Sequence, residues 1–181
     1  GFRFFGNVEV GRELMHADLV RLYDAVVYTV GAQTDRRLGI PGEDLPGSWA
    51  ATEFVAWYNG HPDYQDLSFD LSGERAVVIG NGNVALDVGR ILTSDPDGLA
   101  RTDISDHALA ALRASRVREV VIAARRGPAH SAFTLPELIG LTSTHDVVLD
   151  AADQQRLVTD FAVETDPLTR GKLEILTKLS D

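Results

Sequence analysis

The stretch of sequence that decides the fold is Arg75–Leu92, RAVVIGNGNVALDVGRIL. Its first five residues form an apolar, β-branched run that predicts a buried strand over 75–79, as a parallel sheet requires. The pattern G-x-G-x-x-A follows at Gly80, Gly82 and Ala85, and the apolar periodicity after it predicts a helix. The first glycine permits a tight turn, the second lets a phosphate approach the backbone, and the small third residue lets the helix pack on the strand. The pattern therefore favours a pyrophosphate site at the N-terminus of this helix over a turn whose glycines serve packing alone.

A second buried strand is predicted over 119–123, and it runs into Arg125 and Arg126. In a dinucleotide-binding fold, an acidic residue at this place binds the 2′-OH of NAD, whereas an arginine accommodates the 2′-phosphate of NADP. Guanidinium groups match phosphate oxygens two at a time. The distance from the glycines exceeds the usual ~20 residues, and a polar insertion over 93–106 accounts for the excess. The pair favours NADP(H) over NAD, with a solvated basic pair as the alternative.

Outward from this unit, apolar runs alternate with helical patterns. Further helices are predicted over 13–22, 50–58, 107–114, 134–141, 151–161 and 172–179, and further strands over 2–10, 23–30 and 147–149. This order predicts the fold class α/β, with a Rossmann-like three-layer domain and a mostly parallel sheet. The loop over 31–47 holds the densest turn chemistry of the chain, and a domain boundary is expected near its start.

Composition and charge exclude several classes of function. The 181 residues carry 17 Lys and Arg against 27 Asp and Glu, for a net charge of −10, so no nucleic-acid partner is expected. The chain has no Cys, which excludes a disulfide scaffold, thiolate zinc sites, an iron–sulfur cluster held by this chain and a cysteine nucleophile. The five His are scattered without metal-ligand spacing, so no metal site is expected. The sequence has no G-x-S-x-G nucleophile elbow and no P-loop lysine after the glycines, so it lacks the signatures of acyl transfer and of ATP hydrolysis.

Three further expectations concern location, context and aromatic residues. No apolar run reaches the roughly 20 residues of a membrane-spanning helix, so no transmembrane segment and a cytoplasmic location are expected. The sequence opens on Gly1 and a strand-like run, and it is expected to be a piece of a longer protein. Trp49, Trp57 and Tyr58 have rings that suit stacking on a planar ligand, but packing between domains is the favoured interpretation.

Several motifs together resemble the adrenodoxin reductase-like ferredoxin–NADP reductases, in particular the bacterial, actinobacterial type. The resemblance rests on the segments Gly80–Val88, Arg125–Pro128, Ala132–Thr134, Glu137–Leu138, Ile40–Glu43, Trp57–Asn59 and Leu99–Ile104. In that family, an NADP domain is inserted into a split FAD domain. The resemblance therefore implies that residues 1–34 are a tail of the FAD-binding domain and that residues 35–181 are the NADP(H)-binding domain.

The resemblance also implies roles for individual residues. The pyrophosphate would be held by Asn81, Gly82, Asn83 and Val84 after the turn at Gly80, and the 2′-phosphate by Arg125 and Arg126. Arg36 and Glu137 occupy further positions where the family contacts NADP, and Val10 is the expected contact with the adenine of FAD. No catalytic residue is assigned. Two residues depart from the family pattern, because Gly140 replaces a usual second acid and Gly89 a usual Ala.

On this resemblance, the chain is expected to be the NADP(H)-binding domain of a FAD-dependent ferredoxin–NADP reductase, an oxidoreductase. The parent protein would pass a hydride from NADPH to FAD and then single electrons to a ferredoxin-type partner. This chain is expected to be inactive without the FAD domain. Two alternatives stay open, namely the matching domain of a glutamate-synthase small-subunit-like flavoprotein and a non-catalytic NADP-sensing module. Arg101–Ile104 and Trp57–Asn59 favour the ferredoxin reductase over the glutamate-synthase type.

Overall fold

The computed structural model describes residues 1–32 and 34–179, and it divides into two compact units, Gly1–Thr34 and Asp35–Asp181. The division lies in the turn-rich loop where the sequence predicts a boundary. Which cofactor each unit serves stays a prediction.

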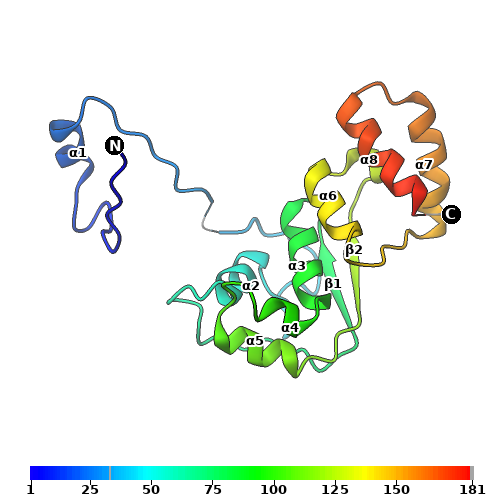
Figure 1. The fold of residues 1–181 in the computed structure, drawn as a ribbon, viewed down its shortest axis with the longest axis horizontal. Helices are drawn as coiled ribbons and strands as arrows, with labels where there is room; N and C mark the ends of the chain where they lie inside the picture. The colour runs from blue at the N-terminus through cyan, green and yellow to red at the C-terminus, as the bar shows by residue number, and fades with distance from the viewer. Residues whose placement is uncertain (33, 180–181) are drawn as a thin grey trace. The chain divides into compact units, whose positions relative to one another are not determined.

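The first unit holds helix α1 (His16–Leu22) between irregular segments (Figure 1). The strands predicted here, over 2–10 and 23–30, are wrong: apart from an isolated bridge between Val10 and Leu14, the backbone there is irregular. A strand is stable only when a neighbouring strand pairs with its N–H and C=O groups. No such neighbour exists among the described residues of this unit, and the side chains of the apolar runs are exposed, with Phe2 at 92%.

The second unit is built on two parallel strands, β1 (Arg75–Ile79) and β2 (Glu119–Ala123), which have the bounds predicted from the sequence. The residues pair in register from Arg75 with Glu119 to Ile79 with Ala123. Helix α3 (Asn83–Thr93) follows β1 and packs on both strands, as Figure 1 shows. This parallel β–α–β arrangement confirms the α/β class.

The two faces of this sheet differ in burial. Ala76, Val78 and Val120 pack against the helices, whereas Val77 and Ile79 are 59% and 56% exposed. Successive side chains of a strand point to opposite faces, so helices cover one face and leave the other open. The prediction that both strands are buried on both faces is therefore wrong for the part of the chain that the structure describes. Among the described residues, no helix covers the second face of the sheet.

Helices make up most of the rest of the second unit. They are α2 (Ala51–Tyr58), α4 (Pro96–Leu99), α5 (Asp106–Arg113), the 3₁₀ turn η1 (Pro128–His130), α6 (Leu135–Thr142), α7 (Ala151–Val163) and α8 (Pro167–Lys178). The helices predicted from the sequence are confirmed, although α8 begins at Pro167 rather than at residue 172 and α1 at His16 rather than at residue 13. Helix α4 adds one turn inside the polar insertion. The strand predicted over 147–149 is wrong, because its backbone pairs with no described strand and Val148 is 85% exposed.

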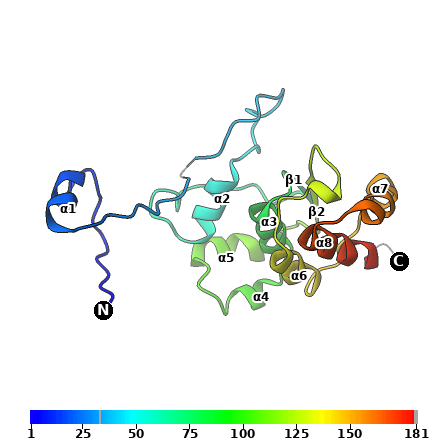
Figure 2. The same ribbon diagram turned by 90° about the horizontal axis from the view of Figure 1, so that it is seen from above.

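Two hydrophobic clusters meet on α3. The first surrounds Trp57, which is 3% exposed and packs with side chains of the second unit, Val88 of α3 among them. Trp57 is therefore a core residue of this unit, and the prediction that it packs between domains is wrong for the described residues. The second gathers Leu138, Leu157 and other side chains of α6, α7 and α8 around Leu86 of α3. Figure 2 shows α2 and α5 on one side of α3, with α6 and α8 on the other. Both clusters therefore fix the position of α3 and of the turn that begins it.

None of the helices in the described part of the chain has the length and apolar character needed to span a membrane. Within the same residues, no three His, Asp or Glu side chains come together as metal ligands would.

Candidate functional site

The glycine-rich turn lies at the carboxyl end of β1. Gly80 has φ = +130°, a conformation that other residues rarely adopt, and its N–H donates to Ala123 O at 2.8 Å, next to the end of β2. Gly82 is the N-cap of α3 with an extended backbone (φ = −93°, ψ = −179°). A Cβ added at Gly82 would meet no atom within 4 Å. The second glycine therefore leaves open space in front of the helix, where a phosphate would need to approach.

The first turn of α3 presents backbone N–H groups without acceptors. Within the described residues, the N–H groups of Gly82, Asn83 and Val84 donate no hydrogen bond, and Ala85 N–H bonds back to Gly82 O at 3.0 Å. Unpaired N–H groups at a helix start carry partial positive charge, and the dipole of this 11-residue helix adds to it. The chemistry of this end suits an anion such as a pyrophosphate.

The segment between η1 and α6 forms two hydrogen bonds with the glycine-rich turn. The N–H groups of Ala132 and Phe133 both donate to Asn81 O, each at 3.0 Å. The C=O and the following N–H of a trans peptide point to opposite sides, so Gly82 N–H points away from this segment. These two hydrogen bonds orient the turn with a free donor on its open side.

The side chain of Asn83 is also engaged within the chain. Its Oδ1 accepts a hydrogen bond from Thr134 N–H at 2.7 Å, which joins the start of α3 to the N-cap of α6. Asn83 therefore has a structural role that the sequence did not predict. Its backbone N–H and its side-chain Nδ2 make no hydrogen bond within the residues described and remain free for a ligand.

Arg125 and Arg126 follow the end of β2, the strand paired with β1, so both lie at the same edge of the sheet as the turn. Both are exposed, and neither forms a hydrogen bond or an ion pair in the described ranges. Two unpaired guanidinium groups next to an anion-binding turn suit a second phosphate. The structure thus brings together the glycine turn and the arginine pair that the sequence singled out.

Arg156 of α7 adds a third positive charge that sequence reasoning missed. A Cβ built on Gly127, next to the arginine pair, would lie 3.4 Å from Arg156 Cδ, 3.6 Å from its Nη1 and 3.9 Å from Asp160 Oδ2, so a carboxylate lies beside this charge. Like the pair, Arg156 is exposed and forms no ion pair among the described residues. No spacing or motif pointed to it, because only the packing of α7 against η1 brings it there.

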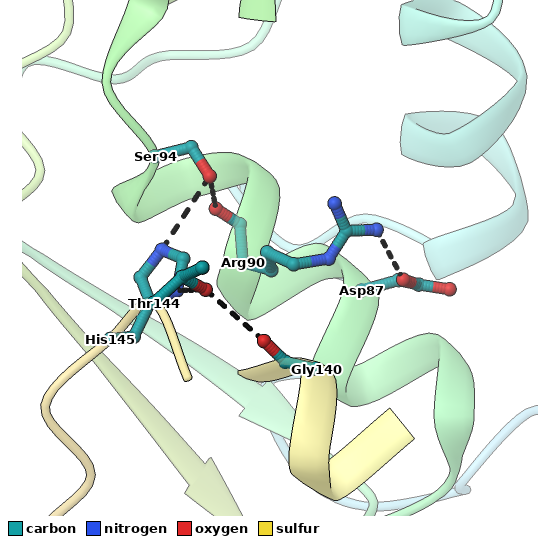
Figure 3. Close-up of polar contacts among 6 residues, drawn as sticks. All are labelled: Asp87, Arg90, Ser94, Gly140, Thr144 and His145. Carbon is teal, nitrogen blue, oxygen red and sulfur yellow. Dashed lines mark hydrogen bonds and ion pairs between the residues drawn. The ribbon is translucent and has the colours of Figure 1, made fainter. Parts of the chain in front are cut away.

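Glu137, in the first turn of α6, lines a cleft of about 400 Å³ between α3 and α6. Arg90 pairs with Asp87 at 2.7 Å on the α3 side of this cleft. Across from them, His145 lies 3.5 Å from Ser94 Oγ through Nε2. The Ser94–His145 contact joins the residues that follow α3 and α6, whereas Arg90 and Asp87 both belong to α3 (Figure 3).

The cleft also contains one of the departures from the family pattern, Gly140, and a shifted ionisation lies outside it, at Tyr58 of α2. A side chain at Gly140 would meet nothing within 4 Å, so the missing acid leaves the cleft open there. Where α2 packs on α3, burial and then the Asp87 carboxylate raise the pKa of Tyr58 above its usual 10.0, which keeps the phenol protonated at neutral pH.

The two remaining expected site residues, Arg36 and Val10, are both exposed. Arg36 lies in an exposed loop whose neighbour Asp35 accepts a hydrogen bond from Thr52 N–H at 2.9 Å, in the first turn of α2. Val10 belongs to the first unit, where its side chain is 49% exposed. No hydrogen bond between described residues links Arg36 to the glycine turn.

A parallel β–α–β arrangement with a glycine turn opening the helix defines a segment of a Rossmann-like α/β domain. Comparison with known proteins confirms the resemblance to the adrenodoxin reductase-like ferredoxin–NADP reductases. No protein-family model matches the chain. It is 66% identical over 180 residues to the probable ferredoxin/ferredoxin–NADP reductase of Mycobacterium tuberculosis, which covers 99% of this chain and 31% of that protein.

Other relatives agree. The bovine mitochondrial NADPH:adrenodoxin oxidoreductase is 52% identical over 153 residues, which are 83% of this chain and 31% of that protein. The structure of Mycobacterium tuberculosis FprA in complex with NADPH superposes with a TM-score of 0.86 at 54% identity, over 99% of this chain and 40% of that one. The chain thus spans about a third of the curated relatives it matches.

Proposed function

We propose that this chain is the NADP(H)-binding part of a FAD-dependent ferredoxin–NADP reductase. Residues 35–181 would form the NADP(H)-binding domain, and residues 1–34 a tail of the FAD-binding domain. The observation that carries the proposal is the group of free N–H donors at the start of α3, next to the unpaired Arg125 and Arg126. The 54% identity to FprA, which was solved in complex with NADPH, supports the same ligand here.

In this proposal, the two ends of the site bind different phosphates. The N–H groups of Gly82, Asn83 and Val84 bind the pyrophosphate, while Gly80 and Asn81 shape the turn. Arg125 and Arg126 bind the 2′-phosphate, which NAD lacks. Since the glycine turn serves both dinucleotides and the arginine pair serves one, the pair decides the preference for NADP(H).

Three more contacts belong to the proposal. Glu137 contacts the nucleotide from the first turn of α6, and Arg36 contacts it from the loop before α2. Val10 contacts the adenine of FAD in the longer protein.

Bound NADPH would supply a hydride for the FAD of the longer protein. The residues of this chain bind the phosphates and thereby orient the nucleotide, and none of them is proposed to react. A ferredoxin-type electron carrier is the proposed partner of the longer protein, and the cytoplasm its proposed location. The names of relatives at 52–66% identity favour this function over a glutamate-synthase type.

The proposal is tested by calorimetric titration of the chain with NADP⁺ and with NAD⁺. We expect saturable binding of one NADP⁺ per chain and weaker binding of NAD⁺. Failure to bind either nucleotide would overturn the proposal, and equal affinity for both would overturn the preference for NADP(H). A non-catalytic sensing module predicts the same binding, but no NADPH-dependent ferredoxin reduction by the longer protein.

A further inference from the structure

Lys172 of α8 is a buried cation whose donors go to carbonyl groups, and the exposed Asp166 carboxylate at the start of α8 interacts with it only through space. Its residue is 9% exposed, and within the described ranges it forms no ion pair. Its Nζ donates to Ser131 O at 2.9 Å and to Phe133 O at 3.3 Å, and it lies 5.5 Å from the centre of the Phe133 ring. Burial of an ammonium group is costly unless its donors are satisfied. Here, two carbonyl groups and an aromatic face satisfy them.

The same two carbonyl groups belong to peptides whose N–H groups hold the glycine turn. The peptide that joins Ser131 to Ala132 accepts from Lys172 on one side and donates to Asn81 O on the other, at 3.0 Å. The described chain has no cis peptide, so the C=O and N–H of this group point in opposite directions.

The next peptide but one repeats this arrangement. Phe133 O accepts from Lys172, and the N–H of the same peptide, that of Thr134, donates to Asn83 Oδ1 at 2.7 Å. A cation on the carbonyl side polarises a peptide and strengthens the hydrogen bond that its N–H donates. Both peptides therefore connect Lys172 to the residues that begin α3.

The buried hydroxyl in this region offers no substitute for the lysine. Ser131 is 8% exposed, and its Oγ has no hydrogen-bond partner among the described residues. Lys172 is thus the group that anchors the carbonyl side of residues 131–134 to α8.

From these contacts, we propose that Lys172 is a positioning residue of the dinucleotide site. Its hydrogen bonds fix residues 131–134, and these residues in turn bond to Asn81 O and to the Asn83 side chain. Lys172 thereby keeps Gly82 N–H directed at the pyrophosphate. This inference rests on the proposed function. Because the pyrophosphate is common to both nucleotides, Lys172 is expected to affect NADP⁺ and NAD⁺ alike, in contrast to the arginine pair.

The test compares Lys172→Met, which keeps the length of the side chain and removes its donors, with Lys172→Arg, which restores donors. The matched control is Lys178→Met on the same helix, where an exposed lysine pairs with Glu174 at 2.9 Å. We expect Lys172→Met to weaken both nucleotides by the same factor, roughly 5- to 30-fold. Lys172→Arg should recover most of this loss, and Lys178→Met should bind as the wild type does.

Hydrogen exchange supplies a readout that does not need the nucleotide. In Lys172→Met, the N–H groups of Ala132, Phe133 and Thr134 should exchange faster than in the wild type, while those within β1 stay unchanged. If the Met variant does not fold, Lys172→Gln, which keeps an NH₂ donor, is compared with Lys172→Arg by the same measurements.

Wild-type affinity for both nucleotides in Lys172→Met or in its Gln substitute, or unchanged exchange at the three N–H groups, would overturn the inference. So would failure of Lys172→Arg to recover affinity. A wild-type chain that binds neither nucleotide would instead overturn the proposed function, and the exchange data would still decide whether Lys172 holds the segment.

Discussion

Arg125 and Arg126 are exposed at the end of β2 and pair with no carboxylate in the described part of the chain. If they bind the 2′-phosphate, replacing both with Ala should weaken NADP⁺ binding by roughly 10- to 100-fold, because each charge-assisted hydrogen bond contributes about 1.5–3 kcal/mol, reduced here by solvent. NAD⁺ has no such phosphate, so its affinity should change little. Calorimetry with both nucleotides measures the difference.

The matched control for this pair is the double variant Arg113→Ala/Arg116→Ala. It removes two arginine charges from exposed positions before the start of β2, where Arg113 of α5 pairs with Asp97 and Arg116 with Glu74. This control should leave the ratio of the two affinities unchanged. A parallel, small effect of Arg125→Ala/Arg126→Ala on both nucleotides would mean that the pair is only a solvated basic surface.

At the scale of the element, α3 carries the site and also a weakness at Gly89. A glycine inside a helix costs about 0.5–1 kcal/mol relative to Ala. A Cβ at Gly89 would lie 3.5 Å from Ile122 Cδ1 and 3.7 Å from Val120 Cγ1, which is ordinary contact with β2. Gly89→Ala should therefore raise the free energy of unfolding by about 0.5–1 kcal/mol in denaturant titrations.

Gly140→Ala in α6 is the control for Gly89→Ala, since a Cβ there would meet no atom within 4 Å and reports helix propensity alone. A loss of stability in Gly89→Ala, with a gain in Gly140→Ala, would mean that α3 cannot accept a methyl group against β2.

The N-terminus of α8 should make stability depend on pH. The hydrogen bond from Thr169 N–H, at 2.8 Å, is the main cause that lowers the pKa of Asp166 below its usual 3.8, and Lys172 adds to it. A carboxyl whose folded pKa is lowered stabilises the fold above its unfolded pKa and loses this effect as pH falls through the folded pKa. Asp166→Asn should therefore melt at a lower temperature than the wild type at neutral pH, and the gap should close in acid below the usual 3.8. A gap that persists there would contradict the charge effect.

At the scale of the whole molecule, the proposed function gives the described residues a site for one dinucleotide. A flavin needs a concave pocket that buries most of its surface. The first unit, where Val10 is the expected FAD contact, has no buried residue among those described. We therefore expect the chain to bind no stoichiometric FAD and to show no NADPH-dependent dye reduction on its own.

The measurement is the ratio of flavin to protein absorbance after incubation with FAD and gel filtration. NADP⁺ titration of the same preparation serves as the control for folding. One retained flavin per chain would contradict the expectation.

Much of the second unit could be predicted from the sequence, because its signals are local. The apolar runs at 75–79 and 119–123 are each bounded by turns, and the helices follow from apolar periodicity. The strands expected over 2–10, 23–30 and 147–149 fail for a physical reason: a strand needs a partner, and residue composition does not specify one. The same apolar side chains occur in strands and in irregular segments, so their pattern alone does not distinguish the two.

The sequence by itself determined the glycine turn, the arginine pair after β2 and the resemblance to ferredoxin–NADP reductases. Each of these rests on short motifs, whose residues are neighbours along the chain. Only the tertiary structure decided what supports that site. Lys172 reaches Ser131 across 41 residues, and Thr134 reaches Asn83 across 51. Such contacts depend on how α8 and α6 pack on α3, and packing is set by the shape and burial of many side chains together, which no local pattern encodes.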